Sequence, residues 1–334
     1  MLAILAPGQG SQAPNLFKSW VDDNSHIDQS LRAKIYTLIK EFAEQSNLDL
    51  KFLGAGANEE EIRNTKNAQP LLFITGLIGL FEIFNTTEIP QQIFSNTEIV
   101  FAGHSVGEVL AFALSGKIEL EAAWKLVCAR GEFMSNSAIG SNTGMSAILG
   151  GDRSEVIKVL DELGLTAANE NGGGQIVAAG DLTSLNKLEQ NPPPGSRIRP
   201  LVVAGAFHTK TMEKAQQQLA ELSKETLQNK LIKNNSVLLT NKDGAAVVDS
   251  EKYLELLVGQ VAGPVRWDLT MDQLKKEGVT GVLELPPAGV LSGLMKRNCP
   301  DIEICTMKDA SSLVNAREFI IKHSPSLGKI LGNN

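Results

Sequence analysis

Gly103-His104-Ser105-Val106-Gly107 is the stretch of sequence that decides the fold. The apolar, β-prone residues Glu98–Ala102 precede it, and Val109–Leu114 follow it with the composition of an inward-packing helix. A serine between two glycines at a strand-to-helix boundary is typical of the sharp turn that exposes a nucleophile, because only glycine tolerates the crowding on both sides. We therefore predict that Ser105 is a nucleophile. The N–H of Val106, at the start of the following helix, would stabilise an oxyanion.

Strand and helix patterns alternate on both sides of this turn, which predicts an α/β fold with a mainly parallel sheet. The first strand is expected at Leu2–Ala6, and long helices at about Ile27–Ser46, Gln69–Asn85 and Leu120–Ser137. The longest apolar run, Leu71–Phe84, falls short of the ~20 residues that cross a bilayer. We predict that it is a core helix.

The pattern changes near Gly144, where the expected order becomes βαββαβ, the ferredoxin-like unit. Its strands are predicted at Met145–Leu149, Leu165–Ala168, Gln175–Ala179 and Arg197–Val203, and its helices at Arg153–Leu163 and Leu182–Gln190. We therefore divide the chain into a large α/β domain (1–143 and 205–323) and an inserted ferredoxin-like subdomain (144–204). Residues 324–334 are predicted to form a loosely held C-terminal tail.

The bulk composition excludes several classes of function. The chain has 334 residues, 43% of them hydrophobic, and a net charge of −7, so it has no overall basic field for nucleic acid. Its three cysteines, Cys128, Cys299 and Cys305, form no C-x-x-C pair, which argues against a disulfide scaffold or a metal site and favours a reducing compartment. The short apolar stretch Met1–Ala6 lacks a basic leader and is interpreted as a strand. We expect a cytoplasmic protein with neither a nucleic-acid nor a membrane partner.

A serine nucleophile needs a base, and His208 is the best candidate among the four histidines. It follows the strand ending near Ala204 and opens a helix, at the end of a strand where α/β active sites collect. A capping or structural role for His208 remains an alternative. His104 is predicted to be structural or pocket-lining, whereas His26 and His323 are expected to be solvated.

Arg130 interrupts an otherwise apolar helical face between Ala122 and Gly131. It could be a surface arginine paired with Glu132 or Glu119. It could also be a guanidinium that points into a pocket and holds a carboxylate through two hydrogen bonds.

Six motifs occur in order and at suitable spacing over about residues 1–310, and together they resemble the malonyl-CoA:acyl carrier protein transacylase family. They are Pro7-Gly-Gln-Gly-Ser-Gln12, Gly103-His-Ser-Val-Gly-Glu108, Ala129-Arg130-Gly131 with Phe133-Met134, Gly205-Ala-Phe-His208, Gln260 with Gly263-Pro-Val-Arg-Trp267, and Leu291-Ser-Gly-Leu-Met-Lys-Arg297. The resemblance implies an α/β-hydrolase-like domain that carries an inserted ferredoxin-like subdomain.

The resemblance also implies a role for each matching position. Ser105 would be the nucleophile and His208 its base, while Gln9 and Val106 would supply the oxyanion-hole N–H groups. Arg130 would bind the malonyl carboxylate. Gln260 would orient His208, chiefly through its backbone carbonyl, so that no acid completes a triad.

The implied reaction transfers malonyl from malonyl-CoA to the phosphopantetheine thiol of holo acyl carrier protein through a malonyl-serine ester, in support of fatty acid synthesis. Coenzyme A thioester would be a substrate, no cofactor or metal would be needed, and the chain would be a monomer. Because acyl carrier proteins are acidic, a local basic rim is expected, with Lys296, Arg297, Arg197 and Arg199 as candidates.

Three other functions remain open from the sequence. A serine esterase or thioesterase of the α/β-hydrolase type would share the turn at Ser105, but it would need a buried acid behind the histidine and no Arg130. A non-catalytic carrier-binding protein would not need both Ser105 and His208. An acyltransferase serving a polyketide synthase would keep every residue named above.

Overall fold

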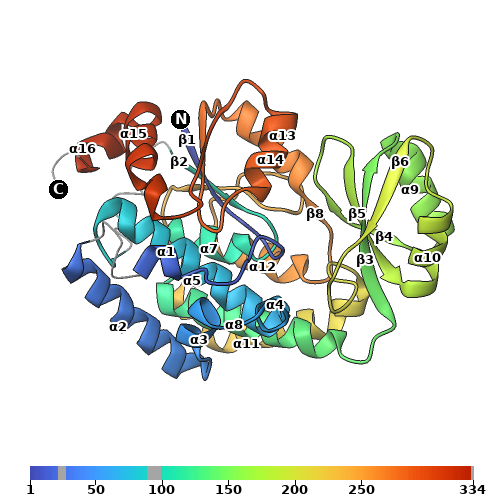
Figure 1. Cartoon of the computed structure of the whole chain (residues 1–334), viewed down its shortest axis with the longest axis horizontal. Coiled ribbons are helices and arrows are strands. Elements are labelled where there is room, and N and C mark those ends of the chain that lie inside the picture. The colour runs from blue at the N-terminus through green and yellow to red at the C-terminus, as the bar shows by residue number, and fades with distance from the viewer. Residues whose placement is uncertain (22–27, 89–98, 332–334) are drawn as a thin grey trace.

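Two five-stranded sheets organise residues 1–21, 28–88 and 99–331, which the computed structural model describes (Figure 1). The first sheet has the order β10-β9-β1-β2-β7 and every neighbouring pair in it is parallel. Its strands are β1 (Leu2–Ala6), β2 (Ile99–Gly103), β7 (Val237–Leu238), β9 (Gly281–Glu284) and β10 (Glu303–Thr306). The expected α/β fold with a mainly parallel sheet is confirmed.

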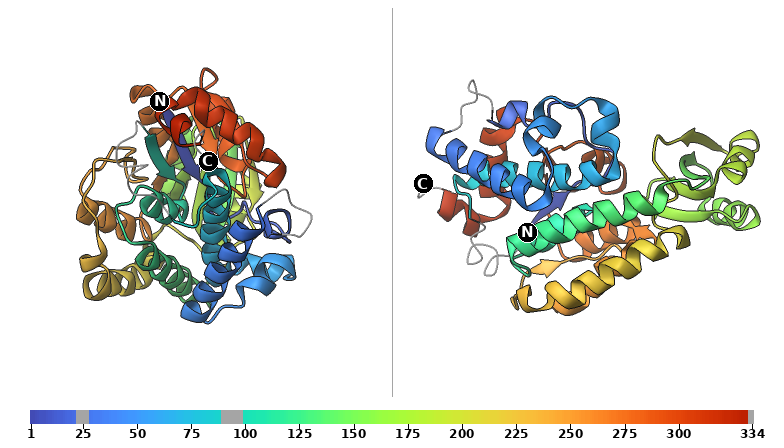
Figure 2. Two further views of the ribbon diagram at one scale, coloured as in Figure 1. Left: turned by 90° about the vertical axis from the view of Figure 1, so that its left-hand side faces the viewer. Right: turned by 90° about the horizontal axis from the view of Figure 1, so that it is seen from below.

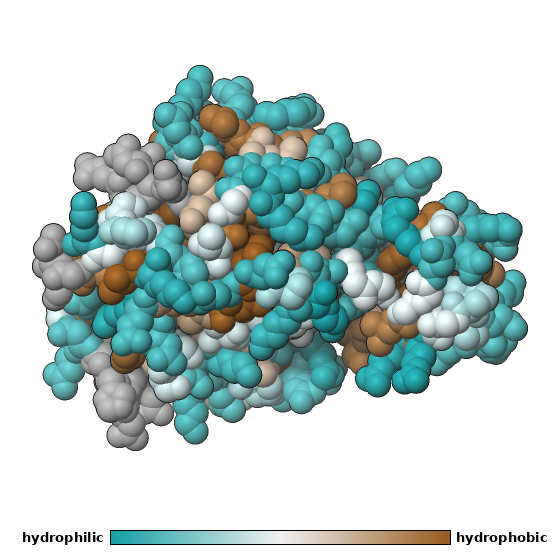
Figure 3. All heavy atoms as spheres, turned by 90° about the horizontal axis from the view of Figure 1, so that it is seen from above, coloured by the Kyte–Doolittle hydropathy of each residue, from teal (hydrophilic) through white to brown (hydrophobic). Residues whose placement is uncertain are grey.

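The second sheet has the order β6-β3-β5-β4-β8. Its strands are β3 (Thr143–Gly150), β4 (Thr166–Glu170), β5 (Gln175–Asp181), β6 (Ser196–Pro200) and β8 (Val265–Arg266). The helices α9 (Arg153–Glu162) and α10 (Leu182–Gln190) complete the predicted βαββαβ order. In the space-filling view this lobe projects from the larger body beyond a narrowing (Figure 3).

Helices cover the parallel sheet and connect it to the small lobe. The right-hand view of Figure 2 shows α8 running from the larger body toward that lobe with α11 alongside. The helices of the larger body are α1 (Lys18–Val21), α2 (Gln29–Ser46), α3 (Leu50–Ala55), α4 (Glu59–Arg63), α5 (Thr65–Phe84), α7 (Gly107–Leu114), α8 (Leu120–Ala138), α11 (Glu213–Thr226), α12 (Ser250–Gln260), α13 (Trp267–Lys276), α14 (Val290–Asn298), α15 (Leu313–His323) and α16 (Pro325–Leu331).

The central strand β1 is buried on both faces, and its alternate residues belong to two different cores. Leu2 and Ile4 pack into the cluster that includes α5, α7 and α8, whereas Ala3 and Leu5 pack against α13 and α14. Side chains of a strand alternate between its faces, so a parallel sheet covered on both sides needs apolar residues at every position. The run Leu-Ala-Ile-Leu-Ala meets that requirement.

The turn between β2 and α7 has the predicted shape. A Cβ at Gly103 would lie 2.0 Å from the carbonyl carbon of Gly107, and a Cβ at Gly107 would lie 2.2 Å from the carbonyl oxygen of Ala6. Ser105 between them has a left-handed backbone, with φ of 53°. Close approach of β1, β2 and α7 therefore requires glycine at both flanking positions.

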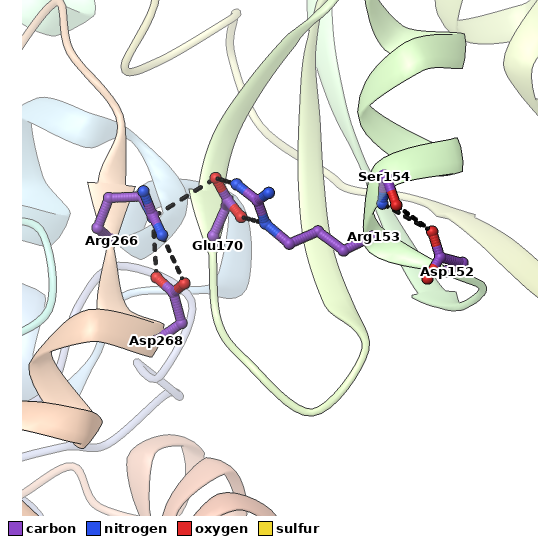
Figure 4. A network of polar contacts seen from close by, with 6 residues as sticks. All are labelled: Asp152, Arg153, Ser154, Glu170, Arg266 and Asp268. Atoms are coloured by element: carbon purple, nitrogen blue, oxygen red, sulfur yellow. Dashed lines mark hydrogen bonds and ion pairs between the residues drawn. The ribbon is translucent and has the colours of Figure 1, made fainter.

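An ion-pair network joins the small sheet to the larger body (Figure 4). Glu170 on β4 accepts hydrogen bonds from Arg153 at 2.6 and 2.9 Å and lies 3.4 Å from Arg266 on β8. Arg266 also pairs with Asp268 at 2.8 Å. Because β8 follows α12 in the chain, the small sheet includes a strand from outside the predicted range 144–204. The domain boundaries themselves stay a prediction.

The predicted core helix is confirmed, but the argument from its length was wrong. Helix α5 covers Thr65–Phe84, so its 20 residues are long and apolar enough to cross a membrane. It starts earlier than expected because the Asn64 side chain caps it, accepting a hydrogen bond from the N–H of Lys66. Since 94% of its most apolar stretch is buried by the rest of the fold, the helix belongs to the protein core.

The prediction of a loosely held C-terminal tail is wrong for the part of it that the structure describes. Residues 325–331 form α16, and Leu327 is completely buried against the core. His323 is also buried, not solvated, because its ring packs on Phe319 and Nδ1 lies 3.0 Å from Oγ1 of Thr280. Arg197–Val203 was expected to be a strand, but β6 ends at Pro200. His26, Ile27, Glu98 and residues 332–334 lie outside the described residues.

We predict that Gly107→Ala destabilises the fold by about 1–3 kcal/mol or more, because the new methyl group meets rigid backbone of β1. Urea unfolding measures the change in the free energy of unfolding. Gly259→Ala is the control: Gly259 lies in α12, a Cβ there meets nothing within 4 Å, and alanine should be neutral or slightly stabilising. Equal stability of both variants would contradict the steric argument.

Candidate active site

A cavity of about 610 Å³ lies where the larger body and the small lobe face one another. Ser105 and His208 lie in its wall, together with residues of the glycine-rich turn after β1. The small lobe contributes Asn169, Asn171, Gln175 and Val177, and α14 contributes Leu291, Leu294 and Arg297. A site between two units is the usual place for a ligand pocket.

The structure brings Ser105, His208 and Gln260 together although they are far apart in the sequence. Ser105 Oγ lies 2.7 Å from Nε2 of His208, and Nδ1 of His208 lies 2.8 Å from the backbone oxygen of Gln260. Nδ1 therefore carries the hydrogen of the neutral imidazole and donates a hydrogen bond to the carbonyl. Nε2 is then unprotonated and can accept the proton of the serine. The carbonyl at the end of α12 takes the place that an acid has in a triad.

The surroundings of His208 keep its imidazole neutral. Burial and the neighbouring Arg130 cation lower its pKa from 6.5 to about 3. A neutral imidazole is the form that can accept a proton, so His208 is prepared to act as a base at neutral pH.

Arg130 is not a surface residue, because only 1% of it is exposed. The alternative of an exposed ion pair with Glu132 or Glu119 is therefore wrong. Its guanidinium donates to Oε1 of Gln69 and Oε1 of Gln260, each at 2.7 Å, and reaches Ser105 Oγ at 3.3 Å. In the described part of the chain its Nε has no hydrogen-bond partner.

The hydrogen-bond partners of Arg130 are two neutral amides and the Ser105 hydroxyl, so no anion in the described residues neutralises the cation by direct contact. Burial lowers the pKa of Arg130 to about 10, opposed by the charge of Glu108. A buried cation whose partners are all neutral can accept a carboxylate without first breaking a salt bridge.

Gln9 and Val106 are the two residues expected to supply the oxyanion-hole N–H groups. Gln9 lines the cavity, and Val106 follows Ser105 at the beginning of α7. Among the hydrogen bonds of the described residues, none uses the backbone N–H of either residue. Two unused N–H groups, one of them at a helix N-terminus, have the chemistry of an oxyanion hole.

Sequence reasoning missed two buried polar residues, Glu108 and Asn241. Glu108 is fully buried and accepts hydrogen bonds from the N–H of Asn241, from the Gln260 amide and from the hydroxyl of Tyr253. Desolvation raises the pKa of Glu108 to about 8. An acid in the first turn of the otherwise apolar helix 107–114 was the available signal. Asn241 gave no comparable signal, because its partners are remote in the sequence.

His104 is pocket-lining, as predicted. Its Nε2 lies 2.9 Å from Oδ1 of Asn171 on the small lobe, and its ring packs against Trp267. Burial lowers the pKa of His104, so it adds no cation beside the nucleophile.

Within residues 1–21, 28–88 and 99–331, no three His, Cys, Asp or Glu side chains gather in a way that could hold a metal ion. The expectation that no cofactor is needed stays a prediction.

Comparison with known proteins identifies the family. The acyl transferase domain family matches residues 5–310. The malonyl CoA-acyl carrier protein transacylase of Mycobacterium tuberculosis is 38% identical over 313 residues, covering 94% of this chain and 98% of its own length. The crystal structure of MCAT from the same species has a TM-score of 0.84 at 37% identity, with 94% of this chain and 99% of that chain covered. A chain from the structure of a type II PKS acyl-carrier protein in complex with its malonyl-transacylase has a TM-score of 0.82 at 26% identity. The match covers 94% of this chain and 98% of that chain. The chain therefore belongs to the malonyl-CoA:acyl carrier protein transacylase family of acyl transferases.

Proposed function

We propose that this protein transfers the malonyl group from malonyl-CoA to the phosphopantetheine thiol of holo acyl carrier protein. The observation that carries the proposal is a serine–histidine pair at 2.7 Å with a buried, anion-free arginine 3.3 Å from the same serine oxygen. The pair provides acyl transfer, and the arginine restricts the acyl group to one that bears a carboxylate.

In the first half-reaction His208 Nε2 takes the proton of Ser105 as Oγ attacks the thioester carbonyl of malonyl-CoA. The N–H groups of Gln9 and Val106 stabilise the oxyanion of the tetrahedral intermediate. Collapse of that intermediate breaks the C–S bond, and His208 returns the proton to the departing coenzyme A thiol. Ser105 then carries the malonyl ester.

In the second half-reaction the carrier thiol gives its proton to His208 and attacks the ester carbonyl. The C–O bond to Ser105 breaks, and the proton returns to Oγ. Throughout, the carbonyl of Gln260 holds the imidazole in the tautomer that both steps need.

The esterase alternative fits the site less well. Nδ1 of His208 contacts a backbone carbonyl, where an α/β-hydrolase-type esterase would place an acid. Glu108 is a buried acid nearby, but its carboxyl group accepts hydrogen bonds from the Gln260 amide and the Asn241 N–H. The partner of His208 Nδ1 is the Gln260 carbonyl. A neutral ester would also leave the Arg130 cation without a partner.

Exposed basic residues, one of which lines the cavity, support an acidic carrier protein as the partner. Arg297 lines the cavity and donates to Gln175 at 3.0 Å, and Lys296, Arg197 and Arg199 are exposed. These residues would attract an acidic carrier although the whole chain is acidic. Fatty acid synthesis as the pathway, a monomeric state and a cytoplasmic location are further parts of the proposal. The first two rest on the resemblance, and the location rests on the cysteine content.

Ser105→Ala should abolish the covalent adduct that malonyl-CoA forms with the wild-type chain, because Ser105 supplies the hydroxyl that is hydrogen-bonded to His208. Intact-mass measurement after mixing with malonyl-CoA detects the ester. His208→Ala should still form it, but about 10²–10⁴-fold more slowly. An adduct of undiminished amount on Ser105→Ala would place the nucleophile elsewhere and reject the proposal.

Arg130→Ala should slow malonyl transfer by raising its activation free energy by about 2–5 kcal/mol, because the substrate carboxylate then enters a buried site without its cation. Acetyl transfer should be unchanged or faster, since acetyl has no carboxylate. Arg130→Lys should recover only part of the malonyl activity, because an ammonium cannot donate the two parallel hydrogen bonds. Rates of acyl-serine formation from the two thioesters provide the comparison, and equal losses for both would make Arg130 structural.

The acid limb of the pH profile of kcat/KM should lie far below the pKa of about 6.5 of a solvated histidine. His208 must be neutral to act, and its lowered pKa keeps it neutral at mildly acidic pH. Arg130→Ala removes one cause of that lowering, so with acetyl-CoA the acid limb should move to higher pH. Acylation rates of both proteins between about pH 3 and pH 8 test this. A limb near 6.5 in the wild type, or one that does not move in the variant, would contradict the assignment of the base.

A further inference from the structure

Side chains from elsewhere in the fold hold both peptide groups that flank Ser105. The N–H of Ser105 donates to Oδ1 of Asn241 at 2.8 Å. The carbonyl oxygen of Ser105 accepts a backbone hydrogen bond from the N–H of Glu108 at 3.0 Å and a side-chain hydrogen bond from Nε2 of Gln260 at 3.2 Å. Asn241 also donates through Nδ2 to the carbonyl of Gly103 at 2.7 Å, so it spans the turn.

The contact from Gln260 has a consequence for the oxyanion hole. The carbonyl of Ser105 and the N–H of Val106 belong to one planar peptide group and point in opposite directions. Holding the oxygen therefore fixes the direction of the N–H that faces the developing oxyanion. A hydrogen bond to the carbonyl also polarises the same peptide and makes its N–H a stronger donor.

One carboxyl group contacts both Asn241 and Gln260. Glu108 Oε1 accepts the backbone N–H of Asn241 at 2.6 Å, and Oε2 accepts the amide of Gln260. Glu108 is fully buried, so water cannot replace either contact. Oε1 also accepts a hydrogen bond from the Tyr253 hydroxyl, and a side chain with a single acceptor oxygen would leave the donor on Asn241 or on Gln260 unsatisfied.

We propose that Glu108 is a positioning residue that sets the direction of the oxyanion-binding N–H of Val106 by holding Gln260 and Asn241. The inference rests on the proposed acyl transfer. It assigns to Glu108 an effect on the transition state, because the oxyanion forms only there, and little effect on the binding of the thioester.

Glu108→Gln is the test, because it preserves shape but leaves an NH₂ group facing one of the two donors. The rate of acyl-serine formation at saturating thioester should fall about 10–100-fold, and the half-saturating concentration should stay the same. Malonyl-CoA and acetyl-CoA should be affected alike, unlike in Arg130→Ala, since the oxyanion is common to both.

Glu82→Gln is the matched control. Glu82 is 2% exposed, its pKa is also raised to about 8 by burial, and it lies in α5 outside the cavity lining. Its substitution should leave acylation unchanged. If Glu108→Gln does not fold, Gln260→Met provides the second test: it keeps the backbone carbonyl for His208 but loses the amide. With acetyl-CoA it should show the same loss of maximal rate.

A folded Glu108→Gln that acylates at the rate of Glu82→Gln overturns the proposal, as does a raised half-saturating concentration with an unchanged maximal rate. For an unfolded Glu108→Gln, a normal rate in Gln260→Met overturns it. A wild-type chain that forms no acyl-serine in the same experiment overturns the proposed function, and the positioning role with it.

Discussion

The left-handed backbone of Ser105 is the constraint on which the site depends. A non-glycine residue with φ near 53° is strained, and such a conformation persists only where surrounding contacts enforce it. Gly103 and Gly107 allow three backbone segments to meet there, and Asn241 holds the peptide on one side. His208 has a left-handed backbone as well, with φ of 59°. Ser105 and His208 are thus both held in backbone conformations that non-glycine residues disfavour.

Burial gives the polar groups beneath this turn their distinct properties. The same low-polarity surroundings keep His208 neutral and destabilise the charge on Glu108, and Arg130 has only neutral hydrogen-bond partners there. If they were exposed to water, the pKa values of these side chains would lie close to those of the free amino acids. The site therefore places the neutral imidazole of His208 and the guanidinium of Arg130 within hydrogen-bonding distance of the same serine oxygen, with the Gln260 amide beside them.

The parts of the fold that follow from local pattern could be predicted from the sequence. The turn at Ser105, the βαββαβ order and both ends of helix 182–190 follow from nearby residues. The contacts of Ser105 with His208 and Asn241 join positions more than 100 residues apart, so no periodicity reveals them. The resemblance supplied Gln260 through its backbone carbonyl, but the four hydrogen bonds of its side chain needed coordinates. The tail was misjudged because Leu327, one buried residue in a polar segment, fixes it.

The origin of β8 limits how independent the small lobe can be. This strand comes from residues 265–266, yet it pairs in parallel with β4, and its Arg266 pairs with Glu170. Residues 144–204 taken alone would have an unpaired β4 edge and a Glu170 that has lost one of its two cations. A chimaera that exchanged only that segment with a relative would therefore break a sheet. The transplantable unit is discontinuous and must include the segment around Val265 and Arg266.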